Sequence, residues 1–228
     1  MLVYLFTMAR GRHPTRIRID PPDAQIAAKY LYRWHGRDLF HEPHRFPSLT
    51  SPELFGNNRP LEIDFGCGQG ILACSRARQY SDSNIFGIEK SQKPLYCAIR
   101  HASELKLDNI KFVRGDFRIM LPLLRPRTVS TVYYLFPNPP QDFHLDRANA
   151  QRRLFMQSIH DALVPGGRFY FATDALSFFE CMYDILKNSL QYRTFDSGTV
   201  DFDISTHYRQ RWEQQGRPFR SIVVEKAP

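Results

Sequence analysis

The strongest indication of the fold class is the segment Leu61-Glu62-Ile63-Asp64-Phe65-Gly66-Cys67-Gly68-Gln69-Gly70. Its first half is typical of a short buried strand, and its second half has Gly-x-Gly-x-Gly spacing before a predicted helix over residues 70–80. Glycines at such a place let the backbone turn tightly and let a ligand approach it closely. A dinucleotide-binding loop has Gly-x-Gly-x-x-Gly and a P-loop ends in Lys-Ser/Thr, whereas Ile71 follows Gly70 here. The loop is therefore either a tight turn or a cofactor site of another kind.

Strands and helices alternate along the chain after residue 60. Short apolar runs rich in β-branched and aromatic residues predict the strands, and Gly and Pro punctuate them. We predict strands over 61–65, 84–89, 109–114, 128–136, 168–173 and 220–225, a further strand within 192–203, and helices over 70–80, 92–105, 150–163 and 175–190. This alternation predicts a doubly wound α/β fold: a mostly parallel seven-stranded sheet with helices on both faces and its ligand at the strand carboxyl ends.

The first quarter of the chain differs from this pattern. Residues 9–60 carry nine basic and five acidic residues, and prolines recur at 43, 47, 52 and 60. We interpret residues 1–59 as a basic N-terminal arm with one helix over residues 24–34, and residues 60–228 as the main domain.

Composition favours a folded protein with a polyanionic partner. Hydrophobic residues make up 43% and charged residues 24%, which argues against disorder. The 31 basic residues exceed the 23 acidic ones by eight, and 24 of the 31 are arginine. Arginine binds phosphate with a planar fork and stacks on bases, so nucleic acid is the first partner to consider.

The cysteines and the apolar runs exclude several classes of protein. Cys67, Cys74, Cys97 and Cys181 show no Cys-x-x-Cys spacing, so a zinc site and a disulfide framework are both disfavoured. We therefore expect no metal and reduced thiols in a cytoplasmic protein. No apolar run approaches the length of a membrane helix, so we expect no membrane partner.

Two acidic residues close the second and third predicted strands. Glu89 can accept hydrogen bonds from both ribose hydroxyls of a nucleoside, and Asp116 can accept one from the exocyclic amine of an adenine. Each could instead be an ordinary strand-end or turn carboxylate. Together with the glycine loop they favour an adenosine-containing ligand, and the spacing of Gly66, Gly68 and Gly70 favours S-adenosylmethionine over NAD.

Candidate substrate residues follow the fourth and fifth strands. Asn138 lies between prolines, which restrict its backbone, and Asp174 closes the fifth strand in Ala-Thr-Asp. The run Ser-Thr-His-Tyr-Arg-Gln-Arg-Trp over 205–212 is basic and aromatic and suits a base or a phosphate. The alternatives are a proline-rich turn, a turn aspartate and an amphipathic helix with a solvated arginine face.

These motifs in this order resemble the bacterial tRNA (guanine-N7-)-methyltransferase family. The matching stretches are Leu-Glu-Ile-Asp-Phe-Gly-Cys-Gly at 61–68, Phe-Gly-Ile-Glu at 86–89, Gly-Asp at 115–116, Leu-Phe-Pro-Asn-Pro at 135–139, Pro-Gly-Gly at 165–167, Ala-Thr-Asp at 172–174 and Thr-x-Tyr-x-x-Arg-Trp from 206. The resemblance implies a Rossmann-like class I methyltransferase that uses S-adenosylmethionine to methylate N7 of the guanine at position 46 in the tRNA variable loop, as a monomer or a homodimer.

The resemblance also implies roles for individual residues. The cofactor-binding positions it implies are Glu62, Gly66, Gly68, Glu89, Asp116 and Asn138. The substrate-binding positions are Asp142, Asp174, Thr206, His207, Tyr208 and Arg209, and Asp174 and Asn138 are the expected catalytic pair. No general base is expected, because N7 of guanine carries a free lone pair.

Four departures mark a divergent member of that family. The family has Asp, Trp, Lys and Glu where this chain has Asn138, Pro140, Asp142 and Arg209.

Two alternative functions stay open on these residues. One is an amino-nitrogen methyltransferase, because Asn138-Pro139-Pro140 also resembles an Asn-Pro-Pro-aromatic motif, although Gln141 occupies the aromatic place. The other is a non-catalytic RNA-binding protein on a methyltransferase scaffold.

Overall fold

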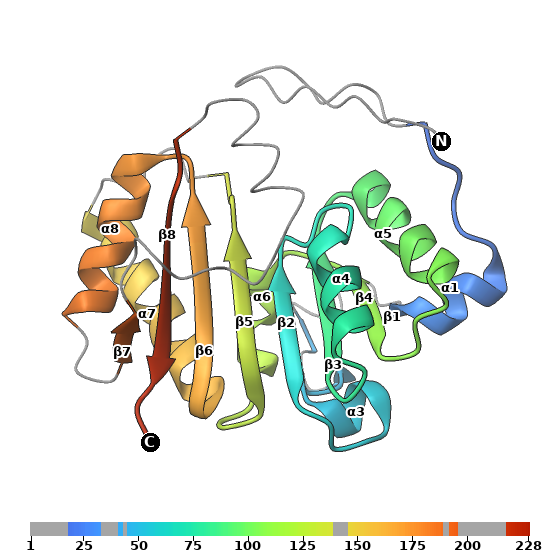
Figure 1. Cartoon of the computed structure of the whole chain (residues 1–228), viewed down its shortest axis with the longest axis horizontal. Helices are drawn as coiled ribbons and strands as arrows, with labels where there is room; N and C mark the ends of the chain where they lie inside the picture. Colours follow the sequence, from blue (N-terminus) through green and yellow to red (C-terminus); the bar gives the residue numbers. More distant parts are fainter. Residues whose placement is uncertain (1–17, 33–40, 43–44, 139–145, 189–191, 196–217) are drawn as a thin grey trace.

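The computed structural model describes residues 18–32, 41–42, 45–138, 146–188, 192–195 and 218–228 of the chain (Figure 1). Its centre is an eight-stranded sheet in the order β1-β4-β3-β2-β5-β6-β8-β7. The strands are β1 (Leu31–Tyr32), β2 (Leu61–Phe65), β3 (Asn84–Glu89), β4 (Ile110–Arg114), β5 (Val129–Leu135), β6 (Leu163–Thr173), β7 (Tyr192–Phe195) and β8 (Arg220–Lys226). Neighbouring strands are parallel except where β8 pairs with β6 and β7. The predicted mostly parallel sheet is confirmed.

Helices cover both faces of the sheet. They are α1 (Ala24–Tyr30), α3 (Ser51–Phe55), α4 (Ile71–Gln79), α5 (Gln92–Glu104), α6 (Phe117–Met120), α7 (Asp146–Ala162) and α8 (Leu176–Lys187), with a short 3-10 helix η2 (Leu121–Leu123) after α6. One apolar layer contains residues of α1, α4 and α5, and a second, larger layer contains residues of α3, α6, α7 and α8. Successive strand residues point to opposite faces, so Ile85 packs in the first layer and Phe86 in the second.

The sheet has one strand more than the seven predicted. The additional strand is β1, which pairs with β4 through Leu31 and Tyr32. These two residues lie in the arm where a helix over 24–34 was predicted, and α1 ends before them at Tyr30. The hydroxyl of Tyr30 donates to the carbonyl of Leu107 (2.8 Å), and Lys111 Nζ donates to the carbonyl of Leu54 (2.9 Å). The described part of the arm thus packs onto the sheet. A two-residue strand shows no alternation of polar and apolar residues, so its sequence carries no strand signal.

Strand β6 begins five residues earlier than predicted. Pro165-Gly166-Gly167 predicts the end of a helix, and α7 does end at Ala162. The backbone then continues directly as β6, because Leu163 pairs with Val129 before the register shifts at an irregularity. Gly166 has a φ of 74° there, a conformation that a side chain disfavours.

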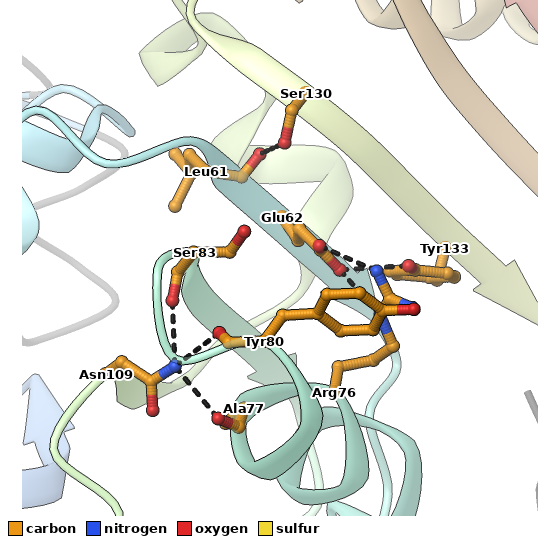
Figure 2. Close-up of polar contacts among 9 residues, drawn as sticks. All are labelled: Leu61, Glu62, Arg76, Ala77, Tyr80, Ser83, Asn109, Ser130 and Tyr133. Carbon is orange, nitrogen blue, oxygen red and sulfur yellow. Dashed lines mark hydrogen bonds and ion pairs between the residues drawn. The ribbon is translucent and has the colours of Figure 1, made fainter.

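Asn109 ties α4 to the strand layer. Its Nδ2 atom lies within 3.0 Å of the carbonyl oxygens of Ala77, Tyr80 and Ser83, which carry the chain from the end of α4 to β3 (Figure 2). These hydrogen bonds hold the end of α4 in place. Because α4 begins directly after the glycine loop, they also help to position that loop.

The parallel strands β2 to β6 direct their carboxyl ends to the same edge of the sheet. Strand β2 has β3 on one side and β5 on the other, so the chain winds away from it in both directions. Doubly wound sheets bind ligands in the crevice at such a switch point. Within the described residues, no helix combines the length and the apolar character needed to cross a membrane.

Candidate functional site

The glycine loop has the geometry of a ligand-binding turn. Gly66, Gly68 and Gly70 adopt left-handed φ values of 76°, 54° and 72°. A Cβ atom on Gly70 would lie 2.6 Å from the Cβ of Ala98, so this glycine lets α4 and α5 pack closely. A Cβ on Gly66 would meet nothing within 4 Å. The first glycine therefore borders open space at the carboxyl edge, as an approaching ligand requires.

Glu89 is held in place by the backbone of this loop and of the next one. Its Oε2 atom accepts a hydrogen bond from the N–H of Gly68 (3.0 Å), and its Oε1 atom accepts one from the N–H of Ser91 (2.7 Å). The side chain is buried. A carboxylate has about four acceptor positions, so two bonds leave Glu89 able to accept hydrogen bonds from a ligand.

Asp64 is a buried carboxylate that our sequence analysis did not single out. It lies two residues before Gly66 and is only 4% exposed. Burial, and then the negative charge of Glu89, raises the pKa of Asp64 to about 7. Among the described residues, none donates a hydrogen bond to its carboxylate. A buried carboxylate of perturbed pKa beside a ligand loop is typical of a functional site. The signal was present in the sequence, as an acidic residue within an otherwise apolar strand end.

Glu62 has a different environment from the one the resemblance implies. Its two oxygens accept hydrogen bonds from Nε and Nη2 of Arg76 (2.9 and 2.8 Å), and the hydroxyl of Tyr133 also donates to it (2.9 Å; Figure 2). The Arg76 guanidinium lies 3.9 Å from the ring centre of Tyr80. Glu62 therefore joins β2, α4 and β5 in a buried cluster, and this geometry favours Asp64 over Glu62 as a ligand-facing carboxylate.

Asp116 begins α6 and is paired with Arg118. The Asp116 side chain accepts hydrogen bonds from the backbone N–H of Arg118 (3.0 Å) and from its Nε atom (2.9 Å). The Arg118 side-chain hydrogen bond holds the pKa of Asp116 below its usual value. The next residue, Phe117, stacks on Phe65 at the end of β2, with ring centres 4.8 Å apart. Asp116 is thus an ionised hydrogen-bond acceptor that lies next to the stacked rings of Phe117 and Phe65.

The turn after β5 begins with a strained residue. Phe136 has a φ of 50°, in the left-handed region that bulky residues avoid. Its backbone N–H donates to the carbonyl of Ala172 (2.7 Å), which continues the contact between β5 and β6. Such a conformation costs roughly 1–3 kcal/mol and persists only where the surroundings enforce it. Pro137 and Asn138 follow directly, and Asn138 is exposed.

Asp174 leaves the neighbouring strand at the same edge. Leu135 of β5 pairs with Ala172 of β6, so the segments after these residues begin side by side. The Oγ1 atom of Thr173 accepts a hydrogen bond from the N–H of Ala175 (3.1 Å), which shapes the turn around Asp174. The Asp174 side chain is partly exposed. The structure therefore brings the segments that carry Asn138 and Asp174 together.

The remaining predicted substrate residues cannot be placed. Asp142, Thr206, His207, Tyr208 and Arg209 lie outside the residues that the structure describes. Across the described ranges, no group of three or more His, Cys, Asp or Glu side chains could hold a metal ion.

Comparisons with known proteins match this chain to methyltransferases. The model of a family described as "Putative methyltransferase" matches residues 58–222. A tRNA (guanine-N(7)-)-methyltransferase of Chloroherpeton thalassium is 36% identical over 227 residues, which cover 95% of this chain and 98% of that protein. A protein of the same name from Rubrobacter xylanophilus is 39% identical over 206 residues, covering 89% and 92%.

Solved structures confirm the class of fold. A Streptococcus mutans protein solved in complex with SAH superposes with a TM-score of 0.53 and 11% identity, over 75% of this chain and 90% of that one. Identity this low bears on the fold alone. The two sequence relatives match most of the chain at more than a third of its positions, so the protein belongs to the tRNA (guanine-N7-)-methyltransferase family.

Proposed function

We propose that this protein transfers a methyl group from S-adenosylmethionine to N7 of a guanine in the variable loop of tRNA. The observation that carries the proposal is the pair of buried carboxylates, Asp64 and Glu89, beside a glycine loop whose Gly66 borders open space. Burial, and then the negative charge of Glu89, disfavours ionisation of Asp64. A ligand with positive charge relieves that repulsion, and S-adenosylmethionine carries a sulfonium and an ammonium group.

The same residues fit the rest of that cofactor. Glu89 retains acceptor positions for two ribose hydroxyls, and Asp116 is an ionised acceptor for an adenine amine. The aromatic ring of Phe117 lies next to Asp116 and offers an apolar surface for a purine. When bound, the cofactor would supply an electrophilic methyl group.

The protein's own contribution to the reaction is orientation and charge. N7 of guanine attacks with its lone pair and loses no proton, so no general base is needed. Holding the two reactants in line can lower the activation barrier by roughly 7–11 kcal/mol. Methylation places positive charge on the purine ring, and the Asp174 carboxylate would stabilise that charge as it develops. The Asn138 amide is neutral and would orient the base.

Mapping the methylated nucleotide tests this function directly. Purified protein is incubated with labelled S-adenosylmethionine and tRNA, and the tRNA is digested to nucleosides. We expect label in 7-methylguanosine. Label in N6-methyladenosine would support the amino-nitrogen alternative, and cofactor binding without any transfer would support the non-catalytic one.

Two variants separate the roles of the two candidate cofactor carboxylates. Asp64→Asn should weaken S-adenosylmethionine binding in calorimetry, because a neutral amide does not balance the positive charge of the ligand. Glu62→Gln is the matched control on the same strand, since it removes one charge from the cluster with Arg76 and Tyr133. It should lower the stability of the protein and leave the cofactor affinity within about twofold. The reverse pattern would restore Glu62 to the cofactor site.

Asp174→Asn tests the charge on the substrate side. The variant keeps the shape of the side chain, so cofactor affinity should stay unchanged. Its single-turnover rate should fall, because the lost interaction strengthens in the transition state. A full rate in Asp174→Asn would exclude the role in charge stabilisation.

A further inference from the structure

The aromatic ring of Phe219 packs against the strained residue of the β5 turn. The ring centres of Phe136 and Phe219 are 5.6 Å apart, with an angle of 70° between the planes, which is the favourable edge-to-face arrangement. Phe219 comes immediately before β8, whose first residue Arg220 pairs with Thr173 of β6. The start of β8 therefore reaches the carboxyl edge of the sheet beside Asp174.

Phe136 needs restraints to keep its left-handed backbone. One restraint is the hydrogen bond from its N–H to the carbonyl of Ala172. A second is the contact of its ring with Phe219. A bulky residue without such restraints relaxes toward the extended or helical regions. Because the ring of Pro137 fixes the next φ angle, any rotation at Phe136 passes on to Asn138.

We infer that Phe219 is a positioning residue for methyl transfer, which acts through Phe136 to hold Asn138 at the substrate side of the site. Phe219 lies one residue outside β8 and 81 residues after Asn138 in the sequence. Its effect is on the geometry of the turn, since the glycine loop and Glu89 belong to other strands. The effect on the rate of methyl transfer rests on the proposed function. The effect on the backbone of Phe136 rests on the geometry of the turn alone.

The structural consequence can be measured without substrate. Phe219→Leu keeps an apolar side chain and removes the ring. We expect the backbone N–H of Phe136 to exchange with solvent at least about tenfold faster in this variant, by amide hydrogen exchange followed by NMR. Phe219→Tyr keeps the ring and should restore the original exchange rate.

A matched control removes a similar ring contact at another place. Tyr192 makes an edge-to-face contact with His160 at 5.0 Å, on strand β7 and away from the β5 turn. Tyr192→Leu should lower the stability of the protein and leave the exchange of the Phe136 N–H unchanged. If both leucine variants accelerate this exchange equally, the effect is one of global stability and the inference is wrong.

The catalytic consequence is read from single-turnover methylation of tRNA. A displacement of about 1 Å can cost up to a hundredfold in rate, and we expect at least about tenfold for Phe219→Leu with S-adenosylmethionine affinity within twofold. In a Phe136→Gly background, where the left-handed backbone carries no side-chain strain, the same Phe219→Leu change should have no further effect on rate.

The outcomes distinguish this inference from the proposed function. If the unmutated protein methylates tRNA and Phe219→Leu does so at the same rate, the positioning role is refuted. The positioning role is also refuted if Phe219→Leu slows the reaction by the same factor in the unmutated protein and in the Phe136→Gly background. If the unmutated protein transfers no methyl group to tRNA, the proposed function fails, and the exchange rate of the Phe136 N–H still decides the structural part.

Discussion

Asp64→Asn should change how the stability of the cofactor-free protein depends on pH. The carboxyl of Asp64 is buried beside Glu89, and these two causes raise its pKa from 3.8 to about 7. In the unfolded chain the same carboxyl loses its proton near pH 4. Between these two pH values the folded state therefore holds a proton that the unfolded state has released.

The sign and the size of the effect follow from this difference. A group that binds more protons in the folded state makes the free energy of unfolding fall as pH rises. The loss begins near pH 4 and is complete above about pH 7. A shift of roughly 3 pH units corresponds to about 4 kcal/mol, at about 1.4 kcal/mol per unit. Asparagine has no proton to lose, so Asp64→Asn should become the more stable protein as pH rises, by up to about this amount.

Urea denaturation at constant ionic strength between pH 4.5 and 8 measures this difference. The useful quantity is the free energy of unfolding of the variant minus that of the unmutated protein, since the contributions of titrating groups that do not interact with Asp64 cancel. Asp82→Asn is the control, because Asp82 is exposed in the turn before β3, and its difference should stay flat. A flat difference for Asp64→Asn as well, or one that falls with pH, would show that Asp64 holds no extra proton in the folded state.

Three further predictions concern the loop, its acceptor and the arm. Glu89→Ala should weaken S-adenosylmethionine binding at least about tenfold in calorimetry, because a charge-assisted hydrogen bond contributes roughly 1.5–3 kcal/mol; an unchanged affinity would remove Glu89 from the site. Gly56→Ala, at a φ of 72° with nothing within 4 Å of the new Cβ, should lower the free energy of unfolding in urea by about 1–2 kcal/mol. Gly70→Ala, at the same φ but against Ala98, should lower it by roughly 1–3 kcal/mol more; equal losses of stability would show that the contact with Ala98 is not tight. Deletion of residues 1–19, which include four arginines, should weaken tRNA binding and lower the salt slope in filter binding by about 3, whereas identical slopes would show that the arm does not contact RNA.

Strands β2 and β3 were predicted to the residue, and the physical reason is local. Strands β2 and β3 are buried along their whole length, and Gly or polar residues follow each of them. The change from this buried segment to a glycine or a charged residue therefore marks where each strand ends. Helix α3 was missed because prolines at 47, 52 and 60 favour irregular structure, although Pro52 occupies the first turn, where it is tolerated, and Gly56 provides the left-handed cap.

The site was predicted less completely than the sheet. Strand ends locate Glu89, Asp116, Asn138 and Asp174 at one edge, because parallel strands share their direction. The partner of Glu62 could not be predicted, since Arg76 lies 14 residues later on a helix that returns across the strand. The strain at Phe136 was equally hidden, because a left-handed backbone at a phenylalanine has no sequence signature.

The place of β8 between β6 and β7 has a consequence for synthesis on the ribosome. Strand β7 is made at residues 192–195, yet it has no partner in the sheet until residues 220–226 exist, because its pairs are all with β8. At about 5–20 residues per second this interval lasts a few seconds. Until β8 is in place, β6 has a partner only on its β5 side, so the other edge of this eleven-residue strand, which contains Phe169 and Phe171, is unpaired, and such edges favour aggregation. A nascent chain stalled after β7 and before β8 is made should therefore be a substrate for chaperones.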